Sequence, residues 1–173
     1  MQIHPIDVIS GDVAGLAQQS RQYQAGLYPA ESIHQEDAQA LLATSVYFIG
    51  AYQGQALLGI GAVKRIDASS PYGEIKNLFV DSRYRGQGAS RVIMHALEQH
   101  LVDAGISICR LETGVNQPES IGLYESLGYK RCEPYGDYQA DPLSIFMQKE
   151  LGDFTPSPPG STRGHSKDRG EGI

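Results

Sequence analysis

The stretch from Arg83 to Ala89 carries the residue types and spacing best suited to chemistry in this chain. It reads Arg-Tyr-Arg-Gly-Gln-Gly-Ala, follows an apolar run that ends at Val80, and opens an amphipathic segment that begins at Ser90. This order of strand, turn and helix forms an anion site, because glycines let backbone N–H groups converge on an oxyanion and the helix start adds its positive dipole end. We therefore expect a phosphorylated cofactor here. Three arginines add positive charge where its phosphate would lie: Arg83, Arg85 and Arg91.

The turn differs from two common nucleotide-binding loops. No Gly-Lys-Ser/Thr follows the glycines, so no side chain is placed to hold Mg²⁺ beside a triphosphate. The spacing is not Gly-x-Gly-x-x-Gly, and no acidic residue follows at the end of a second strand to bind a ribose. The pattern Arg-x-x-Gly-x-Gly-Ala resembles instead the pyrophosphate loop of the GNAT N-acetyltransferase superfamily, which binds acetyl-CoA. A basic glycine-rich turn can also be an ordinary loop.

Two further segments carry the same resemblance. Residues 116–129 are similar to the superfamily's signature of an asparagine, a helix and Leu-Tyr-x-x-x-Gly-Tyr. Residues 73–80 resemble its cofactor strand, which often begins with a glutamate. Together the motifs cover roughly residues 1–150 and imply an α/β, GNAT-like acyl-CoA N-acyltransferase fold. A closer resemblance, through Glu112-Thr113-Gly114 and residues 141–147, is to a bacterial subgroup whose substrate is poorly defined.

The resemblance implies which residues contact acetyl-CoA. The backbone from Leu78 to Val80 would pair with the pantetheine arm as an added strand does, and a bulge there would free a backbone N–H at or near Leu78 for the thioester carbonyl. Asn116 would hydrogen-bond the pantetheine, although it can also cap the following helix. The expected cofactor-binding residues are Leu78, Phe79, Val80, Arg85, Gly86, Gln87, Gly88, Ala89, Ser90, Arg91, Asn116 and Tyr124.

A carboxylate is expected to take the proton of the attacking amine. An alkylamine has a pKa near 10, so only about one molecule in a thousand is neutral at pH 7. Glu74 is the candidate general base, and Glu112 is the alternative. Either acid can instead bind a cationic substrate without proton transfer. Glu74 can also be a solvated residue at a strand end or a partner of Lys76, in which case water or another acid takes the proton.

Tyr124 is the candidate general acid. A phenol with a pKa of about 10 can donate a proton to a thiolate leaving group of comparable basicity. In the resembled superfamily, the tyrosine at this place in the signature points at the cofactor sulfur. The alternative is an aromatic core residue, because apolar side chains lie near it on the same helix.

Composition sets the class of protein. The 173 residues suit one domain, and 40% hydrophobic with 20% charged residues is ordinary for a soluble globular protein. The net charge of −6 argues against general affinity for nucleic acid, and no apolar stretch approaches the ~20 residues that span a bilayer. No signal pattern opens the chain, so we expect a cytoplasmic location. Cys109 and Cys132 are expected to be buried free thiols, and the scattered histidines predict no metal site.

Hydrophobic periodicity predicts a mixed sheet of about seven strands with helices on both faces. The strands are expected at residues 2–8, 45–52, 57–66, 74–80, 106–113, 129–132 and 143–149. Asp12 is expected to cap the first helix, and an apolar stripe predicts a second helix over residues 30–43. A third helix over residues 87–104 would connect two parallel strands, and a fourth would begin at Pro118.

Two sections of chain differ in composition. Residues 1–151 form the predicted GNAT N-acetyltransferase domain, whereas the polar residues 152–173, rich in proline, glycine and serine, predict a disordered tail. The resemblance implies transfer of an acetyl group from acetyl-CoA to a primary amine of a small-molecule or amino-acid-like acceptor in a ternary complex, with a homodimer also possible. The alternatives are an acyl-CoA-binding module without catalysis and an enzyme that acetylates a protein amine.

Overall fold

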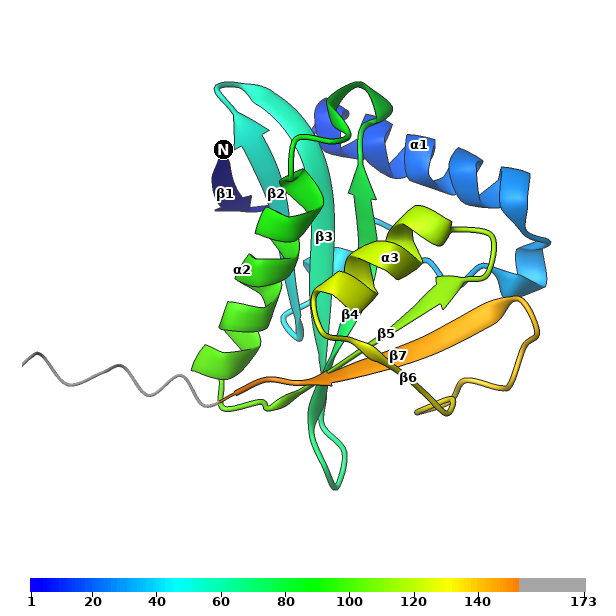
Figure 1. Ribbon diagram of the computed structural model, residues 1–173. Helices are drawn as coiled ribbons and strands as arrows, with labels where there is room; N and C mark the ends of the chain where they lie inside the picture. The colour runs from blue at the N-terminus through cyan, green and yellow to red at the C-terminus, as the bar shows by residue number, and fades with distance from the viewer. Residues whose placement is uncertain (153–173) are drawn as a thin grey trace, which may run out of the picture.

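The computed structural model describes residues 1–152, which form a mixed seven-stranded sheet in the order β1-β2-β3-β4-β5-β7-β6 (Figure 1). The pair β4 and β5 is parallel and the other pairs are antiparallel. The predicted sheet is thereby confirmed. The strands are β1 (Gln2–Pro5), β2 (Val46–Gln53), β3 (Ala56–Ile66), β4 (Tyr72–Val80), β5 (Ile108–Gly114), β6 (Lys130–Cys132) and β7 (Ser144–Glu150).

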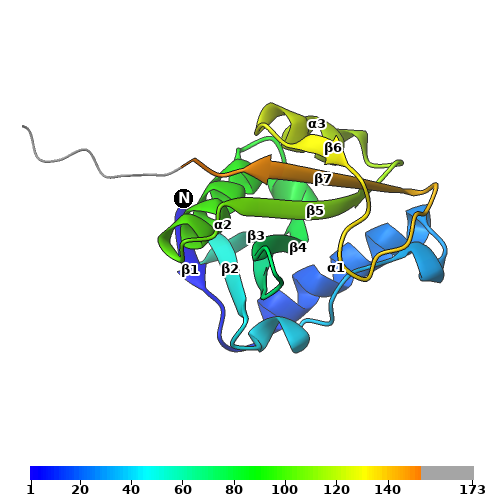
Figure 2. The same cartoon turned by 90° about the horizontal axis from the view of Figure 1, so that it is seen from below.

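Helices cover both faces of the sheet, as predicted (Figure 2). Helix α1 (Gly11–Leu27) packs its buried residues against Phe48 and Ile60 on one face, whereas α2 (Ala89–Asp103) and α3 (Pro118–Ser126) share the core of the other face. The predicted cap of α1 was wrong. Ser10 caps the helix by accepting a hydrogen bond from the backbone N–H of Val13, and Asp12 lies in the first turn, where its charge complements the helix dipole.

The predicted helix over residues 30–43 is also wrong. Two single 3₁₀ turns, Ala30–Ser32 and Ala40–Leu42, enclose an irregular stretch. The Asn77 side chain on β4 accepts from the backbone N–H of Glu36 at 3.0 Å and donates to its carbonyl at 2.8 Å. Lys76 donates to the carbonyl of His34 at 3.0 Å. Because β4 side chains bind these backbone groups, they are not available for a helical ladder.

Strands β4 and β5 separate beyond their first paired residues. Their register joins Gly73 to Cys109 and Glu74 to Arg110, and the pairing ends there. Beyond this point β4 carries a bulge, since the register with β3 shifts between Ile60 and Ala62 while Asn77 adopts a left-handed conformation with φ of 53°. The expected irregularity is therefore present beside Leu78. The separation opens one end of the sheet between two neighbouring strands.

Of the predicted tail, residues 153–173 lie outside the described part, so the domain boundary at residue 151 stays a prediction. Cys109 is a buried free thiol as expected, whereas Cys132 is only half-buried. Within residues 1–152, no helix combines the length and apolar character needed to cross a membrane.

Candidate active site

A cleft of about 350 Å³ lies at the open end of the sheet, between the end of β4 and the start of α2. We call it the loop cleft. The structure brings most of the predicted cofactor-binding residues together in its wall, and α1 and α3 close the other sides. The predicted residues that line it are Leu78, Phe79, Val80, Arg85, Gly86, Gly88, Ala89 and Ser90.

Backbone geometry gives the loop cleft its anion-binding character. Gly86 and Gly88 have φ of 77° and 83°, in the left-handed region that residues with a side chain rarely adopt. Gly88 is also the N-cap of α2, and no side chain caps the first backbone N–H groups of the helix. Those N–H groups and the positive dipole end are therefore suited to bind a phosphate oxygen.

The three arginines of the loop differ in position, and their expected place beside a phosphate stays a prediction. Arg85 lines the loop cleft, where its guanidinium lies 5.5 Å from the ring centre of Tyr23. Arg83 binds the buried Asp81 at 2.8 Å and lowers the pKa of that carboxyl to about 2. Arg91 donates to the Ser126 hydroxyl at 2.7 Å. The carboxylate and the hydroxyl therefore hold Arg83 and Arg91 away from the loop cleft.

A smaller polar chamber of about 70 Å³ adjoins the loop cleft. Tyr124 and Glu112 both line it, and so does Leu78 beside the bulge. Tyr124 is only 6% exposed, and burial together with the nearby Glu112 raises its pKa above the ordinary range. Burial also raises the pKa of Glu112, while the neighbouring Ser144, His34 and Lys76 act in the opposite direction. The residues common to the chamber and the loop cleft are Gln24, Leu78, Gln117 and Ser120.

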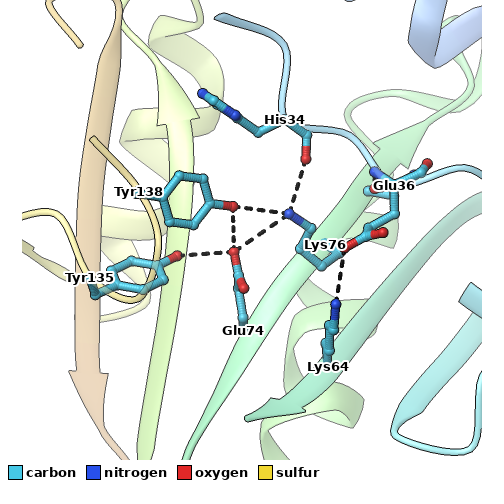
Figure 3. Close-up of polar contacts among 8 residues, drawn as sticks. His34, Glu36, Lys64, Glu74, Lys76, Tyr135 and Tyr138 are labelled. Atoms are coloured by element: carbon cyan, nitrogen blue, oxygen red, sulfur yellow. Dashed lines mark hydrogen bonds and ion pairs between the residues drawn. The ribbon is translucent and has the colours of Figure 1, made fainter. Parts of the chain in front are cut away.

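On the far side of the chamber is a wider outer cleft of about 930 Å³, which Glu74 lines. Figure 3 shows Glu74 at the centre of a buried polar network. One of its carboxylate oxygens accepts from the Tyr138 hydroxyl at 2.5 Å, from Lys76 at 3.5 Å and from the Tyr135 hydroxyl at 3.4 Å. Lys76 also donates to Tyr138 at 3.0 Å. The residues common to chamber and outer cleft are His34, Lys76 and Tyr138.

The structure separates the two predicted acids. Glu112 lies in the chamber with Tyr124, whereas Glu74 lies in the outer cleft and is paired with Lys76. Both remain predictions as bases. The predicted partnership of Glu74 with Lys76, given above as its alternative role, is present.

Three other predicted cofactor-binding residues lie apart from the loop cleft. Asn116 is exposed and lines neither the cleft nor the chamber, and Gln87 and Arg91 are likewise absent from their walls. Gln117 was missed by the sequence analysis, although it is buried and lines both spaces. Its side chain accepts a hydrogen bond from the Tyr28 hydroxyl at 3.3 Å.

The Glu-Thr-Gly motif has a steric explanation that could have identified Tyr28. A Cβ atom at Gly114 would lie 1.9 Å from the Tyr28 hydroxyl, so only glycine leaves room for that ring. The same hydroxyl accepts from the backbone N–H of Asn116 at 3.0 Å. Tyr28 thus joins the end of α1 to the start of α3 across the chamber.

Among residues 1–152, no group of three or more His, Cys, Asp or Glu side chains is arranged to hold a metal ion.

Comparisons with known proteins agree with this geometry. Residues 14–129 match the model of the acetyltransferase (GNAT) family. An "IAA acetyltransferase" from Azospirillum brasilense is 39% identical over 139 residues, which cover 80% of this chain and 90% of the relative. A Klebsiella pneumoniae crystal structure described as an acyl-CoA N-acyltransferase is 28% identical with a TM-score of 0.71, and the match covers 87% of this chain and 97% of the other.

A third comparison concerns the fold alone. The PaiA N-acetyltransferase of Thermoplasma acidophilum, solved in complex with coenzyme A, has a TM-score of 0.65 at 18% identity. The match covers 87% of this chain and all of the other. A fold that holds coenzyme A in that protein is therefore also the fold of this chain.

Proposed function

This chain belongs to the acetyltransferase (GNAT) family and is an acyltransferase, and we propose that it transfers the acetyl group of acetyl-CoA directly to a primary amine. The acceptor is a small molecule or an amino-acid-like compound. One observation carries the proposal: the loop cleft, the polar chamber and the outer cleft adjoin one another in that order. A cofactor and an acceptor can therefore enter from opposite sides and meet in the chamber, as a ternary complex requires.

The cofactor would occupy the loop cleft. Its pyrophosphate is bound by the backbone N–H groups around Gly86 and Gly88 and by the start of α2. Its pantetheine arm lies along the end of β4, in the opening where β5 no longer pairs, and completes the ladder there. In this proposal the backbone N–H of Leu78, beside the bulge, stabilises the oxyanion that forms on the thioester carbonyl.

The contacts favour Glu112 over Glu74 as the general base. Glu112 faces the chamber, carries no ion pair within residues 1–152, and has a raised pKa, which brings a carboxylate closer to the basicity useful near neutral pH. Glu74 already accepts from Lys76 and two tyrosine hydroxyls. Its role is then to hold Lys76 and Tyr138 at the boundary between chamber and outer cleft.

The proposed chemistry moves two protons. The neutral amine attacks the thioester carbonyl, a C–N bond forms, and the amine proton passes to Glu112 directly or through water. The tetrahedral intermediate then collapses, the C–S bond breaks, and the hydroxyl of Tyr124 gives its proton to the departing thiolate. Tyr124 carries this proton at neutral pH, because a phenol has a pKa of about 10 and burial raises that of Tyr124 further. Solvent afterwards returns the proton to Tyr124 and removes one from Glu112.

Thiol release from acetyl-CoA in the presence of a panel of amines tests the proposal. The panel should contain alkylamines, polyamines, ω-amino acids and a lysine peptide. IAA, which the name of the Azospirillum brasilense relative contains, is tested beside the amines. Initial rates with both substrates varied should give intersecting lines. Parallel lines, or a stable acetyl-enzyme formed without an acceptor, would rule out direct transfer. Turnover of the peptide alone would reassign the acceptor to a protein amine.

Two further points belong to the same proposal. We expect the enzyme to act in the cytoplasm, where its free thiols Cys109 and Cys132 stay reduced. We also expect a homodimer, which light scattering at several protein concentrations would measure.

A further inference from the structure

Arg110 is the one cation of the outer cleft that no carboxylate neutralises within residues 1–152. Three lysine or arginine side chains line this cleft. Lys64 pairs with Glu36 at 3.3 Å and Lys76 pairs with Glu74 at 3.5 Å, whereas Arg110 makes no ion pair. A half-buried guanidinium without a counter-ion is a site for an anion from outside the chain.

The lack of an ion pair at Arg110 within residues 1–152 is not explained by its distance along the sheet from a carboxylate. Glu74 is the register neighbour of Arg110 on β4, so the two side chains leave adjacent strands at the same level. The Glu74 carboxylate nevertheless binds Tyr138 and Lys76. The Arg110 guanidinium lies over two aromatic rings instead, 4.5 Å from the ring centre of Tyr72 and 5.5 Å from that of Tyr135.

The stacking leaves the hydrogen-bonding edge of Arg110 available. Arginine carries five N–H donors in one plane. Nε donates to the Gln148 side chain at 3.4 Å, and the guanidinium also lies close enough to the Tyr72 hydroxyl to oppose the rise in the pKa of that phenol. Within residues 1–152 the two terminal NH₂ groups pair with no carboxylate, and they form the fork that binds a carboxylate through two parallel hydrogen bonds. Tyr72 and Tyr135 hold the plane of that fork in position, so little conformational entropy is lost on binding.

The strand geometry places this fork at a defined spacing from the chamber. Arg110 and Glu112 are two residues apart on β5 and therefore point to the same face of the sheet. Two residues of a strand span ~7 Å. Glu112 lines the chamber where the amine would react, and Arg110 lines the outer cleft. A ligand bound to both would therefore carry its amine and its anionic group several bonds apart.

We propose that the acceptor is an amino carboxylate whose carboxylate binds Arg110 while its amine, several bonds away, enters the chamber. This inference rests on the proposed function, since it names the substrate class of the same site. Five acidic side chains line the cleft: Glu31, Glu36, Glu74, Asp137 and Asp141. Glu36 and Glu74 are paired with lysines, and Asp141 accepts from the Ser32 hydroxyl and the backbone N–H of Leu143. Glu31 and Asp137 are exposed, where water screens their charges more than at the sheet floor. 6-Aminohexanoate, whose amine and carboxylate lie at opposite ends of an alkyl chain, is the probe of this class.

The first test compares 6-aminohexanoate with pentylamine, which has the same chain without the carboxylate, and with the shorter 4-aminobutyrate. Wild-type enzyme should show the highest kcat/KM for 6-aminohexanoate. Arg110→Met keeps the stem that packs on Tyr72 and should lower that value ~10–100-fold, while kcat/KM for pentylamine changes less than about twofold. The kcat/KM of Arg110→Lys for 6-aminohexanoate should lie between the values of wild type and Arg110→Met, because lysine keeps the charge without the fork.

Arg131→Met is the matched control, since it removes the same charge from an exposed position of β6 that lines none of the three spaces. Arg131→Met should leave kcat/KM at the wild-type level for both 6-aminohexanoate and pentylamine. A wild-type preference for pentylamine, or an equal loss for both acceptors in Arg110→Met, would overturn the inference. An equal loss would show that Arg110 only supports the fold.

A second readout separates this inference from the proposed function. Calorimetry measures the binding of hexanoate, which has no amine, to the full chain in the presence of coenzyme A. If hexanoate binds wild-type protein and not Arg110→Met while no amine is ever acetylated, the carboxylate site stands and the proposed function fails. If amines are acetylated but hexanoate does not bind, the proposed function stands and the carboxylate site is wrong.

Discussion

The loop cleft and the outer cleft are built in opposite ways. The wall of the loop cleft suited to a phosphate is mostly backbone: two left-handed glycines, a bulge in β4 and the uncapped start of α2, all within residues 77–91. Side chains of α1 and α3 close its other sides. The outer cleft is mostly side chains, contributed by the stretch after α1, by β3, β4 and β5, and by the segment before β7 (Figure 3). The phosphate-binding wall of the loop cleft is therefore local in the sequence, while the outer cleft is assembled from distant segments.

The difference has a chemical reason. A pyrophosphate is bound well by any set of converging N–H groups, so glycine spacing is enough to specify its site. An acceptor is distinguished by its own functional groups, which need side chains at particular positions in space. The chamber between the two clefts combines both designs, since Leu78 beside the bulge lines it together with the side chains of Glu112 and Tyr124. Substitutions in each region should therefore affect different kinetic constants.

The largest effect is expected in the chamber. Tyr124→Phe removes the hydroxyl and keeps the buried ring, so the thiolate would leave without a proton. We expect kcat to fall ~10²–10⁴-fold while the affinity for coenzyme A stays near the wild-type value. Steady-state kinetics and calorimetry measure the two quantities. Wild-type turnover in Tyr124→Phe would mean that Tyr124 is a core residue without a role in catalysis.

A smaller loss, about a hundredfold in kcat/KM at neutral pH, is expected for Glu112→Gln. The base must be ionised to act, and its raised pKa moves the acidic limb of the profile above the pH at which an ordinary glutamate, with a pKa of about 4.3, would place it. Glu112→Gln should lose the acidic limb of the pH profile. Its kcat/KM should recover in part at high pH, where more of the amine is neutral.

Glu74→Gln provides the comparison for that experiment. It keeps the shape of the side chain and weakens its hold on Lys76, so we expect a higher KM for the acceptor with the acidic limb retained. Loss of the limb in Glu74→Gln, with its retention in Glu112→Gln, would restore Glu74 as the base. A wild-type profile in both variants would mean that water or another acid takes the proton.

These two regions also explain what could be predicted from sequence. The wall of the loop cleft formed by the end of β4 and the start of α2 contains most of the residues expected from the sequence, because its determinants are adjacent glycines and a strand end; their contacts with the cofactor stay predictions. The helix assigned to residues 30–43 failed for the opposite reason. Its apolar stripe suits a helix, but the amide of Asn77 and the ammonium of Lys76 bind its backbone groups, and those contacts join residues about 40 positions apart.

The same limit applies within the site. Tyr28 and Gln117 meet across a sequence separation of 89 residues, and nothing local marks either one. The exception is Gly114, whose missing side chain makes room for the Tyr28 ring. Glu112 was predicted only as an alternative base, because its place in the chamber depends on the separation of β4 from β5.

In the loop cleft, Gly88→Val should weaken coenzyme A binding at least tenfold, equivalent to about 1.4 kcal/mol. A β-branched residue is strained at φ of 83°, and its side chain would stand where the phosphate approaches. Gly54→Val is the matched control, since Gly54 has a φ of 58° in the β2–β3 turn, away from the loop cleft. If Gly88→Val and Gly54→Val lose similar stability but Gly88→Val loses more affinity for coenzyme A, the loss of affinity comes from the loop cleft. An unchanged affinity in folded Gly88→Val would remove the proposed phosphate site.

The smallest effect concerns Asp81, a side-chain contact that supports the backbone of the loop. Its carboxylate accepts from the backbone N–H of Arg83 at 2.9 Å and from the guanidinium at 2.8 Å, and its pKa is lowered to about 2. Asp81→Asn should lower Tm by ~2–4 °C at pH 6. Because the folded pKa lies below the unfolded value of about 3.9, this stabilisation is complete above pH 4 and is lost as the pH falls toward 2.

The difference in Tm between wild type and Asp81→Asn should therefore shrink over that interval, which thermal unfolding at several pH values measures. Asp67→Asn is the control, since Asp67 pairs with Arg65 while both side chains are more than half exposed, and such pairs stabilise little. A difference for Asp81→Asn that stays constant from pH 6 to pH 2 would show that shape, and not the carboxylate charge, matters at this position. The backbone of the loop cleft would then depend on its glycines and not on a carboxylate charge. The loop cleft would differ even more from the outer cleft, which is built from side chains.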